Sequence, residues 1–381
     1  MRFLFFAAQY IPTVGGVERY TYNLTKALAT AGHSITIVTS ELRDLPSEEK
    51  DGNIAIIRLP AYLPLNGRLP LLKKNRKFRR LAKKIFENKY DLAVINTRFY
   101  PLSLFASKQC GKRTIRAIVI EHGSGHLSLG NPFINFFVHI YEHIAIKRVY
   151  RFCEDFYGVS LSCTAWLEHF KITAKGVIYN AIDVAGVSLL AGRSSFNVRE
   201  QFRLADKTVA VFSGRFLKEK GILELLEAFR YIGRSEDSVV LVMAGDGPLF
   251  SETAENLPDN VYLTGQLPYA DSLALLKQSD LFILPTYSEG FSTVTLEAAA
   301  FGKLIITTPT GGNNELISSM KSGILLEEIS AEAIAEAVRF ALRNPEFRES
   351  CGNAVKQTVE SGFNWAVSAE KIVSITGKIG E

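Results

Sequence analysis

The sequence predicts an α/β protein with two doubly wound, Rossmann-like domains. Short apolar runs typical of strands alternate with helical stretches, and this alternation occurs twice along the chain. The length of 381 residues exceeds what one hydrophobic core usually supports. A hydrophobic content of 47% with 22% charged residues is typical of a soluble globular protein. We therefore expect two domains, each with a mostly parallel sheet.

The strand candidates fall into two sets. In the first half they lie near residues 2–8, 34–40, 53–59, 91–96, 115–121, 155–160 and 176–180. In the second half they lie near residues 207–213, 238–244, 260–264, 281–284, 304–307 and 323–326. The weakly patterned stretch at 184–205 places the boundary between a first domain of residues 1–184 and a second of 185–363. The tail from 364 to 378 is expected to be helical.

Composition narrows the class of protein further. The four cysteines have no paired spacing, which favours a reducing, cytoplasmic compartment. The apolar start of the chain ends at Gln9, too early for a signal peptide, and no apolar stretch of about 18 residues predicts a spanning helix. No Asp-x-Asp pair and no zinc spacing occur, so neither a metal nor a cofactor is expected. The net charge of +5 suits anionic partners such as nucleotide diphosphates or acidic lipid surfaces.

The most informative stretch is PTYSEGFSTVTLEAAAFG, at residues 285–302. It follows an apolar strand candidate, Gly290 lets the backbone approach a ligand, and Ser292 or Thr293 can cap the helix that contains LEAAA. A strand that leads through a short loop into a helix presents free backbone amides at the carboxyl edge of a sheet. Phosphate groups are held at such edges.

Two glutamates, Glu289 and Glu297, flank the start of this predicted helix. Both can accept hydrogen bonds from ligand hydroxyls if they face one ligand. The alternative is that Glu289 is an ordinary loop acid and Glu297 part of a solvated helix face. The pair alone does not distinguish these interpretations.

Other residues with suitable chemistry follow strand candidates. Gly15 and Gly16 come after the first strand and can bring backbone amides against a phosphate. Arg215 and Lys220 follow the strand at 207–213, and His122 ends the strand at 115–121. Each also has an ordinary explanation: a plain glycine turn, two exposed cations and a structural histidine.

The stretch at 285–302 resembles the Glu-x7-Glu signature of the retaining glycosyltransferases of family 4. Further segments match this family in order along nearly the whole chain: GGVERY at 15–20, EHG at 121–123, YNAID at 179–183, GRFLKEKG at 214–221, AGDGPL at 244–249, TGQL at 264–267 and TGGNNELI at 310–317. The resemblance implies the GT-B architecture, in which two doubly wound domains face each other across a cleft. The first domain then binds the acceptor, the second binds a nucleotide sugar, and the tail helix at 364–381 packs back on the first.

The resemblance also implies roles for individual residues. Arg215 and Lys220 hold the donor diphosphate, Glu297 binds the ribose hydroxyls, and Glu289 and His122 contact the transferred sugar. His122, Glu289, Arg215 and Lys220 are the expected catalytic residues. The residues expected to bind the donor are Gly15, Gly16, Arg215, Lys220, Gly247, Pro248, Gln266, Leu267, Glu289, Gly290, Phe291, Ser292, Thr293 and Glu297. The common family pattern has glycine where Ser292 stands, so this serine is a candidate determinant of donor choice.

Two segments are candidates for acceptor or membrane contact. The basic run that begins at Lys73 and ends at Lys84 predicts a helix with Leu71, Phe78, Leu81 and Ile85 on one face. This helix either lies on an anionic membrane or covers the sheet with a solvated basic back. In the segment 131–150, Asn131 and Pro132 are start signals for a helix with an apolar face and a polar stripe. The polar stripe comprises Asn135, His139, Glu142, His143 and Lys147. Its apolar face is explained by buried packing or by a groove for a lipid-linked acceptor.

The resemblance to family 4 implies an expected function. We expect transfer of a sugar, with retention, from a nucleotide diphosphate sugar with UDP as the favoured nucleotide. The expected acceptor is a hydroxyl of a glycan or lipid-linked saccharide in cell-surface polysaccharide or lipopolysaccharide synthesis. A cytoplasmic protein is expected, with the inner face of the cytoplasmic membrane as a peripheral location, and nucleic acid is not an expected partner. The alternatives are a sugar-nucleotide epimerase and a catalytically silent, membrane-associated binding subunit.

Overall fold

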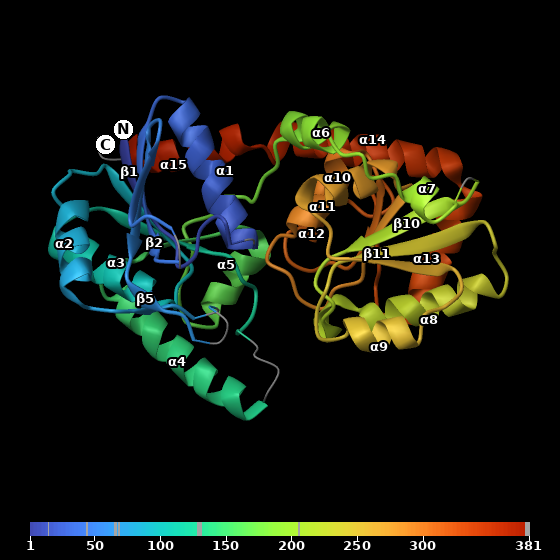
Figure 1. Cartoon of the computed structure of the whole chain (residues 1–381), viewed down its shortest axis with the longest axis horizontal. Helices are drawn as coiled ribbons and strands as arrows, with labels where there is room; N and C mark the ends of the chain where they lie inside the picture. The colour runs from blue at the N-terminus through green and yellow to red at the C-terminus, as the bar shows by residue number, and fades with distance from the viewer. Residues whose placement is uncertain are drawn as a thin grey trace. The chain divides into compact units, whose positions relative to one another are not determined.

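The computed structural model describes residues 1–13, 15–42, 45–64, 67, 69–127, 132–204 and 206–377. The chain divides into two compact units (Figure 1). Unit 1 comprises Met1–Asn180 and Trp365–Glu381, and unit 2 comprises Ala181–Asn364. The boundaries expected from the sequence were 184/185 and 363/364.

Unit 1 contains a seven-stranded sheet in the order β3-β4-β2-β1-β7-β8-β9. Its strands are β1 (Arg2–Phe6), β2 (Ser34–Ser40), β3 (Glu48–Asp51), β4 (Ile54–Leu59), β7 (Leu92–Asn96), β8 (Ala117–Glu121) and β9 (Asp155–Gly158). All neighbouring pairs are parallel except β3 with β4. A small antiparallel pair, β5 (Ala61–Tyr62) and β6 (Leu71–Leu72), forms a separate sheet. The strand order reverses between β1 and β7, the point at which open α/β sheets bind ligands.

Helices cover both faces of this sheet. They are α1 (Gly16–Thr30), α2 (Arg76–Ile85), α3 (Pro101–Lys112), α4 (Pro132–Tyr150), α5 (Leu161–Glu168) and α15 (Trp365–Gly377). Leu4 and Phe6 of β1 belong to one core cluster with residues of α2, α3 and α4. Phe3 and Phe5, also fully buried, point to the other face because successive strand residues alternate, and α1 packs there against α15.

Unit 2 contains a six-stranded, fully parallel sheet in the order β12-β11-β10-β13-β14-β15. Its strands are β10 (Thr208–Ser213), β11 (Val239–Ala244), β12 (Val261–Gly265), β13 (Leu281–Leu284), β14 (Leu304–Thr307) and β15 (Ile324–Leu325). Its helices are α6 (Val184–Gly192), α7 (Val198–Gln201), α8 (Ile222–Gly233), α9 (Phe250–Glu255), α10 (Tyr269–Gln278), α11 (Thr293–Ala300), α12 (Asn313–Leu316), α13 (Ala331–Arg343) and α14 (Pro345–Gly362). The strand order reverses here between β10 and β13.

The prediction of two doubly wound α/β units is confirmed, with several local differences. Residues 176–180 form no strand, and only an isolated bridge joins Gly158 to Val177. The weakly patterned stretch 184–205 contains two helices that the pattern did not predict, α6 and α7, whose starts are capped by the side chains of Asp183 and Asn197. Strand β3 was missed because its sequence EEKD is polar and fully exposed at the sheet edge.

The chain returns to unit 1 after α14, as the family resemblance implied. Helix α15 packs on α1, and the rings of Tyr20 and Trp365 meet edge to face at 5.5 Å. The Ser368 hydroxyl donates to the Tyr179 carbonyl oxygen at 2.9 Å. The C-terminal helix therefore completes the first domain.

The basic helix α2 is shorter than the run that predicted it. It begins at Arg76 because the Asn75 side chain accepts a hydrogen bond from the Phe78 amide. Leu71 lies in β6, so its expected place on the helix was wrong. The remaining apolar face, including Leu81 and Ile85, is buried in the core cluster. Only the basic back of α2 is available to a partner, and two of its lysines pair with Glu41 and Glu48.

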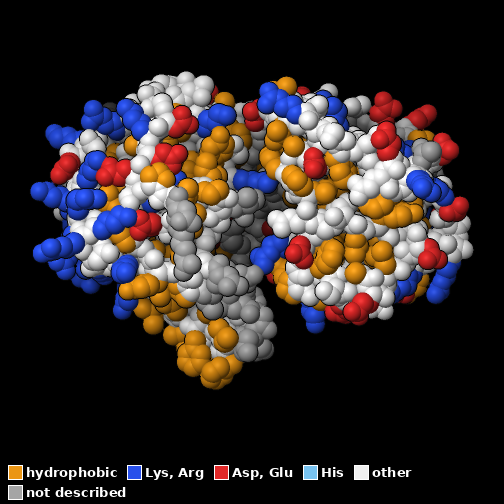
Figure 2. All heavy atoms as spheres, in the orientation of Figure 1, with side chains coloured by type: hydrophobic (Ala, Val, Ile, Leu, Met, Phe, Trp, Pro, Cys, Tyr) orange, Lys and Arg blue, Asp and Glu red, His pale blue; other side chains and the backbone are white. Residues whose placement is uncertain are grey.

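Helix α4 differs between its two ends. In its C-terminal half Ala145, Ile146 and Val149 are buried, although Ile144 is exposed. In its N-terminal half the large apolar side chains are exposed, namely Phe133, Ile134, Phe136, Phe137 and Ile140. Figure 2 shows hydrophobic side chains gathered over the projecting end of α4. Asn131, an expected start signal, lies outside the described residues. Glu142 was expected in the polar stripe but is fully buried. Among helices in the described ranges, none combines the length and apolar character needed to cross a bilayer.

Candidate functional site

The carboxyl edge of the unit 2 sheet brings Lys220 and Glu289 together. Lys220 ends a short 3-10 turn after β10, and Glu289 lies in the loop after β13. The Lys220 Nζ lies 3.1 Å from Glu289 Oε1 and donates to the Ser288 carbonyl oxygen at 3.1 Å. Both side chains remain partly accessible, at 15% and 25%. Two of the expected catalytic residues are thus in direct contact although 69 positions separate them.

Helix α11 starts at the same edge. The Ser292 hydroxyl accepts a hydrogen bond from the Thr295 amide at 3.2 Å, which makes Ser292 the N-cap. Phe291 and Ser292 are almost completely buried. The start of α11 is therefore fixed where the sequence predicted a capped helix, and its positive end lies at the carboxyl edge.

Glycine is required where the loop after β14 meets the loop after β13. Gly311 has φ 57°, and a Cβ at this position would lie 2.6 Å from the carbonyl oxygens of Glu289 and Gly290. The Gly312 amide donates to the Gly290 carbonyl oxygen at 3.0 Å. The TGG segment thus supports the backbone that carries Glu289.

The capping role of Ser292 leads to a stability prediction. Ser292→Ala is expected to lower the free energy of unfolding by about 1 kcal/mol, because the Thr295 amide loses its acceptor. Ser292→Gly is expected to cost only a few tenths of a kcal/mol, since glycine is tolerated at N-caps. Urea unfolding of both variants measures the difference. Equal losses in the two variants would contradict the capping role.

Glu297 lies deeper than the other candidates. It stands one turn inside α11, is 2% exposed, and accepts a hydrogen bond from the Tyr269 hydroxyl at 2.9 Å. The interpretation of Glu297 as part of a solvated helix face is therefore wrong. A buried carboxylate with a hydroxyl partner is suited to polar recognition rather than to solvation.

The remaining unit 2 candidates follow neighbouring strands at the same edge. Arg215 comes after β10 and is exposed, and within the described residues its side chain forms no hydrogen bond or ion pair. Gly247 and Pro248 follow β11, while Gln266 and Leu267 follow β12. The structure thus gathers the unit 2 candidates along the carboxyl ends of β10 to β13.

In unit 1, Gly15 and Gly16 lie at the start of α1, directly after the loop that follows β1. Gly15 is the N-cap residue, and a Cβ placed on it would lie 2.2 Å from Glu18 Oε2. Glu18 therefore curls back over the helix start, and burial raises the pKa of its carboxyl. This carboxylate lies beside Gly15, whereas a Cβ placed on Gly16 would meet no atom within 4 Å.

His122 follows β8 and is held by a chain of hydrogen bonds. The Thr21 hydroxyl donates to the Val17 carbonyl oxygen at 2.7 Å, so it accepts from the Asn96 amide at 3.2 Å. The Asn96 Oδ1 is then the acceptor 2.8 Å from His122 Nε2. This order makes Nε2 the protonated nitrogen and leaves Nδ1 as an acceptor. Burial lowers the pKa of His122 from 6.5 to about 3, so the ring is neutral near pH 7.

A pH-dependent loss of stability follows from this neutral ring. Below pH 6.5 the unfolded chain protonates His122, whereas the folded protein does so only near pH 3, so stability falls as the pH falls through this window. Between pH 7.5 and 5 we expect His122 to account for a loss of about 2 kcal/mol. Urea unfolding at both pH values measures it for the wild type and for His122→Gln. Equal losses in the two proteins would contradict the prediction.

The sequence analysis did not identify a buried charge network beside the EHG segment at 121–123. Arg98 Nη1 lies 2.7 Å from Glu121 Oε1, and its Nη2 lies 3.2 Å from Glu142 Oε2. All three side chains are at most 1% exposed. Glu121 Oε1 also accepts the amides of His122 and Gly123, at 3.1 and 3.0 Å. The network thus fixes the backbone of the EHG segment. The sequence signal for it was the polar NTR segment at residues 96–98, where the apolar strand β7 ends.

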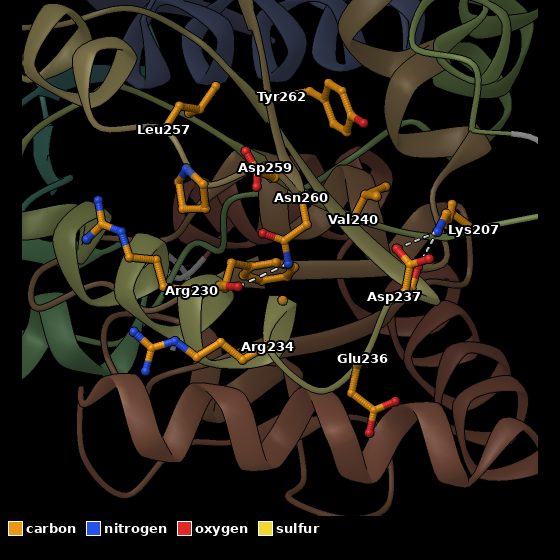
Figure 3. Close-up of a pocket in the computed structure, with 13 residues that line it drawn as sticks. Lys207, Arg230, Arg234, Glu236, Asp237, Val240, Leu257, Asp259, Asn260 and Tyr262 are labelled. Atoms are coloured by element: carbon orange, nitrogen blue, oxygen red, sulfur yellow. Dashed lines mark hydrogen bonds and ion pairs between the residues drawn. The ribbon is translucent and has the colours of Figure 1, made fainter.

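A surface pocket lies away from these residues (Figure 3). It is lined by residues that precede β10, β11 and β12, including Lys207, Asp237 and Asn260. Lys207 pairs with Asp237 at 2.8 Å, and the Asn260 amide donates to the Phe229 carbonyl oxygen at 3.0 Å. The pocket is therefore at the amino edge of the unit 2 sheet, and the candidates are at the carboxyl edge.

Known proteins match both units. The model of Glycosyltransferase Family 4 matches residues 14–185, and the model of Glycosyl transferases group 1 matches residues 195–358. An uncharacterized glycosyltransferase of Methanocaldococcus jannaschii is 25% identical over 98% of both chains. The capsular polysaccharide biosynthesis glycosyltransferase CapM of Staphylococcus aureus is 27% identical over 69% of this chain and 68% of its own. The structure of Anabaena HepE in complex with UDP-glucose superposes with a TM-score of 0.73 at 18% identity, over all of both chains.

Fold, family models and relatives agree on one class of protein, the GT-B glycosyltransferases. The chain belongs to glycosyltransferase family 4.

Proposed function

We propose that the protein transfers a hexose or N-acetylhexosamine, with retention, from a UDP-sugar to a hydroxyl of a glycan or lipid-linked saccharide in cell-surface polysaccharide synthesis. The observation that carries this proposal is the pairing of Lys220 with Glu289 beside the start of α11. A cation, a sugar-binding carboxylate and a helix N-terminus are the groups that a nucleotide diphosphate sugar needs. The CapM relative, named for capsular polysaccharide biosynthesis, supports the pathway.

The proposed donor site lies along the carboxyl edge of unit 2. Arg215, Lys220 and the amides of α11 would neutralise the charge that grows on the diphosphate as the glycosidic bond breaks. Glu297 and its Tyr269 partner would receive the ribose hydroxyls. UDP is the proposed nucleotide, and the HepE complex with UDP-glucose supports it. Gly247, Pro248 and the TGQL segment would contact the base.

The proposed reaction uses no protein nucleophile. The acceptor hydroxyl attacks the anomeric carbon on the face from which the diphosphate leaves, and the leaving phosphate helps to take its proton. Glu289 contacts hydroxyls of the transferred sugar. His122 is neutral and keeps Nδ1 as an acceptor, so its role is to receive a hydrogen bond from a sugar hydroxyl.

The exposed end of α4 supports a lipid-linked acceptor. Phe133, Phe136 and Phe137 are 55 to 73% exposed. Neighbouring aromatic side chains exposed in this way are uncommon on a surface that contacts only water, and they mark interaction sites. The basic back of α2 would add attraction to anionic headgroups, at about 1 kcal/mol per cation near the surface. The N-terminal unit is thus proposed to meet the acceptor, with a location on the inner membrane face.

Ligand-induced thermal shifts test the donor assignment. A ligand that binds only the folded state raises the melting temperature. We expect UDP and one or more UDP-sugars to stabilise the protein, and GDP and ADP to have smaller effects. No shift with any nucleotide would contradict the proposal and favour a silent binding subunit. Interconversion of a UDP-sugar without acceptor would instead indicate an epimerase.

A further inference from the structure

Three histidines of unit 1 come together although they are far apart in the sequence. His126 lies in the loop after β8, His143 in α4, and His169 at the C-cap of α5. One imidazole nitrogen of each lies within 4.8 Å of those of the other two. These residues, here called the histidine cluster, escaped the sequence search because intervals of 17 and 26 residues match no zinc motif.

Two rings of the histidine cluster have a hydrogen-bond acceptor beside Nδ1. His126 Nδ1 lies 2.5 Å from Glu142 Oε2, and His143 Nδ1 lies 2.9 Å from the His139 carbonyl oxygen. With the proton on Nδ1 in each ring, Nε2 is left with a lone pair. A carboxylate or carbonyl acceptor behind a histidine is the arrangement that fixes the tautomer and raises ligand basicity in metal sites.

The buried charges beside the cluster favour an added cation. Glu121 and Glu142 share one guanidinium, that of Arg98, so the three groups carry a net charge of −1 when ionised. Glu121 Oε2 is buried and has no hydrogen-bond partner in the described part of the chain. A dication bound to His126, whose Nδ1 is hydrogen-bonded to Glu142, would reduce this excess of buried negative charge.

The surroundings hold the rings in place. His139 stacks on His126 with ring centroids 4.1 Å apart, and Trp166 stacks on His169 at 4.7 Å. Zinc at about 2.1 Å from each nitrogen needs nitrogens about 3.4 Å apart in a tetrahedral arrangement. Because the nitrogens lie within 4.8 Å of one another, the closure needed is at most about 1.4 Å, which small rotations of the imidazole rings supply.

We propose that His126, His143 and His169 form a site for a divalent transition-metal ion, with zinc as the best match to three imidazoles. The fourth position, on the side of the exposed His169, would be filled by water or a small ligand. The ion would join α4, α5 and the loop that carries His122, and so would rigidify unit 1. It is distinct from the proposed sugar-nucleotide site, and its binding is measured without any sugar or nucleotide.

The test uses the untagged full chain, stripped of metal by a chelator and then titrated with Zn²⁺ and Co²⁺. We expect one equivalent of each to bind, Co²⁺ to give the visible absorption of a tetrahedral nitrogen site, and Zn²⁺ to raise the melting temperature. Because His169 is exposed, the His169→Ala variant should fold. This variant is expected to bind Zn²⁺ and Co²⁺ at least tenfold more weakly than the wild type and to show no thermal shift with Zn²⁺. His143→Gln is the second variant, and it should show the same loss of metal binding and of thermal shift as His169→Ala.

The matched control is His33→Ala, a half-buried histidine of unit 1 outside the cluster. It should bind Zn²⁺ and Co²⁺ as the wild type does. Mg²⁺, which prefers oxygen ligands, should produce no thermal shift. The proposal is overturned if the wild type binds no stoichiometric Zn²⁺, or if His169→Ala and His143→Gln bind it as tightly as the wild type. The histidines would then be a stacked aromatic cluster without a ligand.

Discussion

Lys220→Ala is expected to lower the rate of sugar transfer at least a hundredfold while the protein stays folded. The lysine ammonium lies 3.1 Å from Glu289 Oε1 at the carboxyl edge of the sheet. When it is removed, the negative charge that develops on the leaving diphosphate loses this cation. Transfer is measured as release of nucleotide from the UDP-sugar that gives the largest thermal shift. Circular dichroism and the melting temperature establish that the fold is retained.

The matched control is Lys218→Ala, an exposed lysine of the same 3-10 turn. It should keep nearly full activity, because its charge lies outside the Lys220–Glu289 contact. Glu289→Ala should resemble Lys220→Ala. Full activity in Lys220→Ala or Glu289→Ala would contradict the assignment of the donor site to the carboxyl edge of the unit 2 sheet.

Arg98→Met is expected to lower the free energy of unfolding by about 3 to 5 kcal/mol. Removing one partner of a buried ion network leaves the others uncompensated, and here Glu121 and Glu142 both lose their cation. Equilibrium urea unfolding of the full chain measures the loss. Arg148→Met, an exposed arginine of α4, is the control and should change stability by less than about 0.5 kcal/mol. A loss below 1 kcal/mol in Arg98→Met would contradict the account of this network.

Much of the fold follows from local patterns in the sequence. The strands β10, β11, β13 and β14 are continuous apolar runs buried on both faces, which is typical of parallel sheets covered by helices. Helix α6 was missed because its sequence VAGVSLLAG has no clear helical stripe, although Asp183 was a readable N-cap. Strand β3 was missed because an exposed edge strand needs no apolar residues.

The candidate site was predictable only in part. Residues that follow parallel strands share one edge, so Arg215, Gly247 and Glu289 could be placed together from their positions alone. The contact of Lys220 with Glu289 depends on the path of two loops, which no local pattern encodes. Glu142 was misplaced for a similar reason: helical spacing marks it as polar but cannot reveal that Arg98 lies opposite. The histidine cluster likewise exists only in three dimensions.

The most direct test of the central claim is a crystal structure of the full chain with UDP. We expect the diphosphate within hydrogen-bond distance of Lys220 Nζ and the amides at the start of α11, with the ribose hydroxyls at Glu297. UDP bound elsewhere on unit 2, such as the pocket beside Lys207 and Asn260, would contradict the proposed site. So would a diphosphate that leaves the Lys220–Glu289 contact unchanged and makes no contact with either side chain.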